Sequence, residues 1–163
     1  MRSSVGARRL LAVVLAGAVL GGGMTGCRAE LPGTGQTEET TVNYGDVADA
    51  LASAVPRITE VDSLERSRDG FGYRLSVGLV TDSVQPFSSD ELDRVIETIW
   101  QTLPWEPATI ELVAGAPTAE DEEPVDLRAA AAGLEPLTVT DAGQGGVSLT
   151  DMRARYGEWT EPE

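Results

Sequence analysis

The stretch SSDELDRVIETIWQTL, residues 88–103, constrains the fold of this chain more than any other segment. Ser88 and Glu91 have the spacing of a capping box, in which each side chain binds the backbone of the other residue at the start of a helix. One helical face then collects the apolar residues Leu92, Val95, Ile96, Ile99, Trp100 and Leu103. The pattern predicts an amphipathic helix over 89–103, stopped by Pro104, as the central element of the core.

Weaker patterns precede this helix. Residues 43–55 predict a first helix, with Asn43 as its N-cap and Pro56 after its end. Residues 57–81 predict a hairpin that turns at Arg68-Asp69-Gly70. In the strand after the turn, Tyr73, Leu75, Val77 and Leu79 alternate with other residues, so that strand has one buried face. The strand before the turn alternates poorly, which suggests a bulge or an edge position.

The second half of the chain adds shorter elements. Residues 107–117 predict a strand and 126–134 a short helix, and a possible hairpin surrounds 141–146. A terminal helix over 151–159 is expected to dock on the sheet. The order of these elements predicts an α+β fold, a small antiparallel sheet with helices packed on one face, in one acidic domain over 43–163.

The amino terminus has the features of an export signal. Arg2, Arg8 and Arg9 precede an uninterrupted apolar stretch of 11 residues from Leu10 to Leu20. A membrane-spanning helix needs about 20 such residues, whereas the apolar part of a signal peptide needs about 7 to 15. Small residues follow, as cleavage requires. The length therefore predicts a signal peptide rather than a spanning helix.

The segment Met24–Cys27 resembles the lipobox of bacterial lipoprotein precursors, in which an aliphatic residue, a small residue and Gly or Ala precede the lipidated cysteine. Met24 stands where leucine is usual. The resemblance implies diacylglyceryl transfer to the Cys27 thiol, cleavage before Cys27, and anchoring by acyl chains such as palmitate at the extracytoplasmic face of the cell membrane. The expected parts are a signal peptide over 1–26 and the lipidated Cys27 with a flexible tether over 27–42.

Two alternatives to this interpretation stay open. An ordinary secretory signal would leave Cys27 as an incidental free thiol. The Arg8-Arg9 pair could direct twin-arginine export, although general secretion fits the surrounding residues better.

Composition excludes several classes of function. The chain has no histidine, which excludes Ser-His-Asp and Cys-His catalytic arrangements and zinc sites with histidine ligands. Removal of residues 1–26 takes away three arginines and no acids, so the net charge changes from −15 to −18. Such a surface repels nucleic acid and anionic lipid headgroups, so we expect no nucleic-acid partner and membrane attachment through the lipid alone.

Two groups of carboxylates are candidates for chemistry. Asp62, Glu65 and Asp69 lie near the first predicted hairpin, where a pair could act as acid and base in cleaving a glycan. Interleaved arginines favour surface charge pairing instead. A second group could collect calcium, but it lacks the pattern of an EF-hand loop and favours a solvated linker: Glu120, Asp121, Glu122, Glu123 and Asp126.

Trp105 lies between two prolines directly after the central helix and could be an interface anchor or a lid over the end of the core, which we favour. We expect no catalytic residue, no metal and no cofactor. Two functions stay open: a noncatalytic envelope lipoprotein whose acidic domain binds a partner protein, a cation-rich ligand or cell-wall material, and a lipid-anchored hydrolase that uses paired carboxylates. The absence of histidine and of any recognised catalytic motif favours the first.

Overall fold

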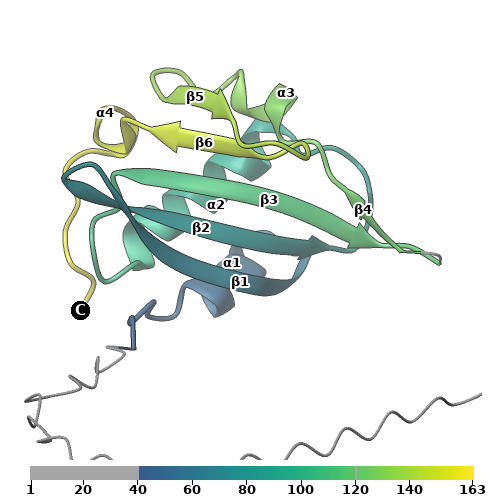
Figure 1. The fold of residues 1–163 in the computed structure, drawn as a ribbon, viewed down its shortest axis with the longest axis horizontal. Helices are drawn as coiled ribbons and strands as arrows, with labels where there is room; N and C mark the ends of the chain where they lie inside the picture. Colours follow the sequence, from purple (N-terminus) through teal and green to yellow (C-terminus); the bar gives the residue numbers. More distant parts are fainter. Residues whose placement is uncertain (1–40, 120) are drawn as a thin grey trace, which may run out of the picture. The chain divides into compact units, whose positions relative to one another are not determined.

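The computed structural model describes residues 41–119 and 121–163, and this part belongs to one compact unit. The predictions for the signal peptide, Cys27 and Glu120 therefore lie outside the described residues, as does the tether prediction up to residue 40. Figure 1 shows the elements in chain order: α1 (Val47–Ala54), β1 (Ile58–Asp69), β2 (Gly72–Thr81), α2 (Ser89–Thr102), β3 (Thr109–Pro117), β4 (Glu122–Pro124), α3 (Arg128–Ala131), β5 (Thr138–Asp141), β6 (Val147–Thr150) and α4 (Met152–Tyr156). None of these helices is long and apolar enough to cross a membrane.

The strands form one sheet in the order β1-β2-β3-β6-β5, and β4 pairs with the C-terminal end of β3. All neighbours are antiparallel except β2 and β3, which pair in parallel. The α+β class is confirmed, but the sheet is mixed rather than antiparallel. The reason is that α2 connects β2 to β3 across the sheet and returns the chain to the same end, so both strands run in one direction.

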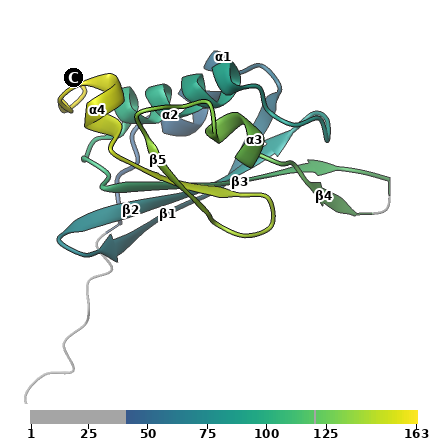
Figure 2. The same cartoon turned by 90° about the horizontal axis from the view of Figure 1, so that it is seen from above.

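The helices pack on one face of this sheet, as predicted (Figure 2). The capping box of α2 is present, because the Ser88 side chain accepts from the Glu91 N–H and the Glu91 carboxylate accepts from the Ser88 N–H at 2.9 Å. All six residues of the apolar stripe are buried: Leu92, Val95, Ile96, Ile99, Trp100 and Leu103. The sheet meets them with the buried side chains Leu75, Val77, Leu79, Ile110, Leu112, Ala114, Val147 and Leu149.

The first hairpin also agrees with the prediction. Strands β1 and β2 turn at Gly70 and Phe71. Strand β1 lies at the sheet edge and has two register shifts, between Ile58 and Glu60 and between Val61 and Ser63. The poor alternation of β1 in the sequence therefore reflects both causes that it suggested, a bulge and an edge position.

Three boundaries differ from the predictions. Asn43 is not the N-cap of α1, because its side chain accepts from the Gly45 N–H at 2.9 Å and the chain turns at Gly45 before the helix begins at Val47. The acidic group that was expected to form a solvated linker contains strand β4, which pairs with β3 through backbone bonds that side-chain charge does not prevent. The expected terminal helix ends at Tyr156, because Gly157 takes a left-handed conformation.

Helix α4 docks on α2 rather than on the sheet. The Arg155 guanidinium donates to both oxygens of Asp93 at 2.7 and 2.6 Å, and the Tyr156 hydroxyl donates to Asp93 Oδ1 at 2.5 Å. These hydrogen bonds, with Arg155 the largest contributor, hold the pKa of Asp93 below its usual range. Asp93 is thereby stabilised as a carboxylate that joins the two helices.

Candidate functional site

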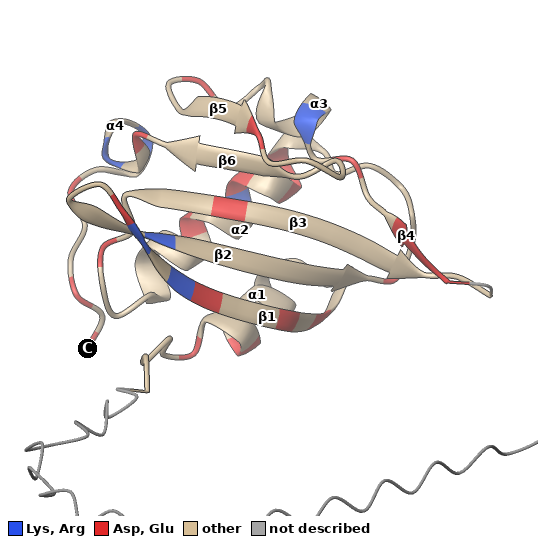
Figure 3. Ribbon diagram, in the orientation of Figure 1, with Lys and Arg blue, Asp and Glu red and all other residues tan. Residues whose placement is uncertain are grey.

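The two faces of the sheet differ. One face is covered by helices, whereas the other has no layer over it in the described part of the chain (Figure 2). Figure 3 looks onto this open face. Strand alternation and the pairing register place mostly small or polar residues there, among them Ser63, Glu65, Ser67, Ser76, Gly78, Glu111, Val113, Gly115 and Ser148. Such a face suits contact with water or with a partner, and it cannot form a second apolar core.

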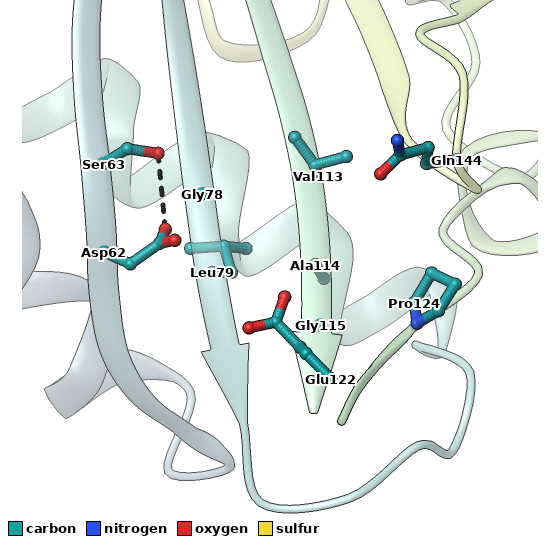
Figure 4. A pocket seen from close by; sticks show the side chains of 10 residues that line it. All are labelled: Asp62, Ser63, Gly78, Leu79, Val113, Ala114, Gly115, Glu122, Pro124 and Gln144. Atoms are coloured by element: carbon teal, nitrogen blue, oxygen red, sulfur yellow. Dashed lines mark hydrogen bonds between the residues drawn. The ribbon is translucent and has the colours of Figure 1, made fainter. Parts of the chain in front are cut away.

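A hollow of about 260 Å³ lies on the open face, at the end of the sheet away from the β1–β2 turn. Figure 4 shows its lining, which comes from β1, β2, β3, β4 and the loop before β6: Asp62, Ser63, Gly78, Leu79, Val113, Ala114, Gly115, Glu122, Pro124 and Gln144. The carboxylates of Asp62 and Glu122 extend from opposite sides toward the middle of the hollow. The hollow therefore combines two acids with a small apolar floor.

Two glycines form part of that floor. A Cβ built on Gly78 would overlap Asp62 Oδ1, and a Cβ built on Gly115 would overlap Glu122 Oε1. Any larger residue at either position would push the carboxylate outward. The absence of a side chain at Gly78 of β2 and at Gly115 of β3 thus lets both acids lie close over the strands.

Irregular pairing brings these two acids into place. Asp62 is the residue skipped by the register shift between Val61 and Ser63, so its side chain lies over Gly78 together with that of Ser63. The Ser63 hydroxyl donates to Asp62 Oδ1 at 3.3 Å. Glu122 is the first residue of β4. Strand β4 pairs with residues 115–117 at the end of β3, past the residues of β3 that pair with β6. Both acids are exposed, so a ligand would meet them directly.

The carboxylates predicted as a catalytic group do not come together. They follow one another along β1, and an extended strand separates Asp62 from Asp69 by roughly 23 Å. Asp69 accepts a hydrogen bond of 2.6 Å from the Thr109 hydroxyl and lies 3.5 Å from Arg74. The Thr109 bond is the largest cause that lowers the pKa of Asp69. Asp69 is therefore held as a carboxylate at the turn end of the hairpin, far from the hollow.

The acids considered for calcium also separate. Glu122 and Glu123 are consecutive in β4, so their side chains point to opposite sides of the strand. Asp126 accepts from Arg128 Nε at 3.1 Å and Nη2 at 3.0 Å. No group of three or more acidic, cysteine or histidine side chains with the arrangement of a metal site exists among the residues that the structure describes.

The lid interpretation of Trp105 is confirmed. Its ring is half-buried against the core and packs edge-on against Tyr44 and Tyr73, with centroid distances of 6.5 and 6.0 Å. The indole Nε1 donates to the Asn43 carbonyl at 3.1 Å. Trp105 thus fastens the first described residues of the chain to the end of the core.

Sequence patterns did not join Asp62 with Glu122, because the two acids belong to separate groups far apart along the chain. A signal was present in the strands themselves. Gly78 interrupts an alternating strand and Gly115 interrupts an apolar one, and an isolated glycine within a strand marks close approach by another group.

The chain matches no protein-family model, no curated protein and no solved structure in the comparisons made with each.

Proposed function

We propose that the protein is a bacterial lipoprotein, anchored through Cys27 at the extracytoplasmic face of the cell membrane, and that its acidic domain is a noncatalytic binding module. The signal sequence and the lipobox-like Met24–Cys27 segment support the anchor. Two acyl chains give stable attachment, so the protein needs no spanning helix to stay at the membrane. The unknown partner is a protein or another component of the cell envelope.

The hollow on the open face is the observation that carries the binding proposal. Its two exposed carboxylates extend over glycine-backed strands, and no arginine is among its described lining residues. A volume of about 260 Å³ is on the scale of one side chain and small for a drug-sized ligand. A cationic group, such as the end of a lysine or arginine side chain from a partner, has the matching charge and dimensions.

The alternative, a hydrolase with paired carboxylates, has less support. The backbone positions of its predicted members Asp62 and Asp69 are roughly 23 Å apart along β1, whereas glycan cleavage uses carboxyl groups about 5 to 10 Å apart. Asp62 and Glu122 do share a hollow, but its volume of about 260 Å³ is too small to enclose a glycan. Binding is the function that this geometry favours.

The anchor is tested by replacing the cysteine. Cys27→Ser should block lipid transfer, so the protein should leave the membrane fraction or accumulate as the uncleaved precursor. The thermal midpoint of the domain should stay unchanged, because the replaced thiol lies outside every described element. A variant that stays membrane-bound and is processed normally would show that Cys27 is not the anchor.

The hollow is tested by titrating residues 41–163 with lysine amide and arginine amide while recording amide NMR spectra. We expect shifts centred on Gly78 and Gly115, and an affinity that falls roughly tenfold in the Asp62→Asn/Glu122→Gln variant, because two charge-assisted contacts are lost. Acetylated lysine amide, which has lost the side-chain charge, should not bind.

A matched control removes the same charge elsewhere. Asp49→Asn/Glu97→Gln changes two exposed acids on the helices and should leave the affinity within about twofold, because surface charges more than about 8 Å from the ligand are largely screened. Equal losses in the two double variants would indicate a general charge effect and would remove the hollow from the proposal.

A further inference from the structure

The turn end of the β1–β2 hairpin differs in charge and exposure from the rest of the domain. The segment from Arg66 to Arg74 carries three arginines and one acid, in a chain of net charge −15. Phe71 at the turn is completely exposed. Figure 3 shows the arginines of β1 and β2 gathered toward this end of the sheet. We call Arg66, Arg68 and Phe71 the hairpin tip.

The two arginines of the hairpin tip are held over aromatic rings. Arg66 lies 4.6 Å from the Tyr73 ring centroid and 5.4 Å from that of Trp105, and Arg68 lies 4.6 Å from Tyr73. Neither forms an ion pair with a carboxylate in the described part of the chain. A guanidinium stacked on a ring keeps N–H donors in its own plane, and these donors fit phosphate oxygens.

Arg66 and Arg68 differ from most of the other described arginines in having no carboxylate partner, a property that they share with Arg94. Five described arginines pair with carboxylates: Arg57, Arg74, Arg128, Arg153 and Arg155. Acids are more than twice as numerous as arginines in this chain, so a carboxylate partner is easy to supply. The hairpin tip instead leaves two cations beside an exposed phenylalanine, and basic and aromatic side chains together favour contact with anionic lipid headgroups.

The start of the described chain lies beside the hairpin tip. The Arg66 backbone N–H donates to the Tyr44 hydroxyl at 3.0 Å, and the Trp105 indole donates to the Asn43 carbonyl. Figures 1 and 2 both place the first described residues and the β1–β2 turn at the same end of the domain. Only 13 residues separate Cys27 from Thr41, which span at most about 50 Å when extended.

We propose that the hairpin tip contacts the anionic phospholipid headgroups of the membrane to which the protein is anchored. This inference rests on the proposed lipid anchor. Phe71 enters the interfacial region, and Arg66 and Arg68 donate to phosphate oxygens. Such a contact is weak alone, but an anchor of this length supplies an effective concentration on the order of millimolar. Screening beyond about 8 Å at physiological salt keeps the acids at the far end of the sheet from preventing it.

The test uses the mature chain, residues 27–163, coupled chemically through its single cysteine to a maleimide lipid in vesicles. Amide hydrogen exchange of residues 66–74 is compared on vesicles of phosphatidylcholine alone and on vesicles in which roughly one lipid in three is anionic phosphatidylglycerol. We expect exchange at the hairpin tip to slow about threefold or more on the anionic vesicles. Residues that line the hollow should exchange equally on both.

Three variants sharpen the test. Phe71→Ser and Arg66→Gln/Arg68→Gln should each abolish the slowing, and the first changes only a side chain that is fully exposed and therefore does not threaten folding. Arg94→Gln/Arg128→Gln removes two arginines elsewhere and should retain it. Equal exchange on the two vesicle types, or slowing that survives Phe71→Ser, would overturn the proposal.

The coupling is chemical, so the outcome does not depend on whether cells lipidate Cys27. Failure of the Cys27→Ser experiment in cells would refute the anchor, whereas failure in the coupled vesicles would refute the membrane contact alone. If amide exchange at the hairpin tip slows only when an envelope protein is added, the hairpin tip binds a protein partner. That result would also overturn the membrane contact.

Discussion

The two ends of the β1–β2 hairpin present side chains of opposite charge, and different local structures hold these side chains in place. At the turn, Arg66 and Arg68 stack on aromatic rings beside an exposed phenylalanine. At the other end, Asp62 and Glu122 extend over Gly78 and Gly115 in a hollow. One end presents cations on a projecting turn, and the other presents anions over a recessed floor.

An unpaired carboxylate and an unpaired arginine have different significance in this chain. Acids outnumber arginines by so many that most carboxylates have no arginine available, so an unpaired acid is ordinary in this chain. Five of the eight arginines that the structure describes do pair with a carboxylate, so an unpaired arginine is less ordinary here than an unpaired acid. What distinguishes the hollow is its shape, set by two glycines and a bulge, and what distinguishes the hairpin tip is its charge.

The largest expected effect tests whether both ends depend on one core. Ile96 is fully buried in the stripe of α2, so Ile96→Ala should lower the free energy of unfolding by about 2 to 5 kcal/mol. Urea unfolding, monitored by hydrogen exchange at both ends of the hairpin, should report the same loss of unfolding free energy at each end. Glu97→Ala, on the exposed side of the helix, should change it by less than about 0.5 kcal/mol. Equal costs at the two positions would refute the stripe assignment.

An intermediate effect is expected where an acid does have an arginine. Asp93→Asn should cost about 1 to 2 kcal/mol near neutral pH, because it weakens the Arg155 and Tyr156 contacts between α2 and α4. Since folding lowers the pKa of Asp93, its contribution is present above the unfolded value of about 3.9 and is lost as the pH falls through the lower folded value.

The measurement is thermal unfolding of both proteins between pH 7 and pH 2. The stability difference between wild type and Asp93→Asn should shrink toward the acid end. Asp62→Asn serves as the comparison from the hollow, where no arginine is paired, and should leave stability within about 0.5 kcal/mol at any of these pH values. A difference for Asp93→Asn that does not vary with pH would contradict the assigned role.

The smallest expected effect on stability comes from filling the floor of the hollow. Gly78→Ala forces the Asp62 carboxylate aside, but that atom is the end of a rotatable side chain, so we expect a change below about 1 kcal/mol. Affinity for lysine amide should nevertheless fall as far as in Asp62→Asn, measured by the same NMR titration. Ser76→Ala, on the open face but outside the hollow, should preserve the affinity. Undiminished affinity in Gly78→Ala would show that the glycine floor is not needed.

Local patterns predicted the elements well. The stripe and capping box of residues 88–103 gave α2 within one residue, because burial of a whole helical face outweighs other preferences. The helix boundary at Asn43 was missed because a positive φ at Gly45 is not visible in a capping pattern. Strand β4 was missed because Glu122 and Glu123 resemble a solvated linker, whereas the pairing is made by backbone atoms.

The candidate site depended on long-range pairing, which local patterns do not determine. The parallel register of β2 with β3 brings Gly78 beside Val113 and Val80 beside Gly115. Until that register is known, nothing connects Asp62 with Glu122. Spacing along the chain suggested Asp62 with Glu65 and Asp69 instead, and an extended strand spreads these three along its length.

Strand β1 affects whether the sheets of neighbouring copies of the protein can pair at their edges. It is twelve residues long and lies at the sheet edge, where a regular strand would offer its free backbone groups to a neighbouring copy. The two bulges of β1 and its charged residues interrupt that regular edge, which disfavours edge-to-edge pairing between the sheets of neighbouring copies.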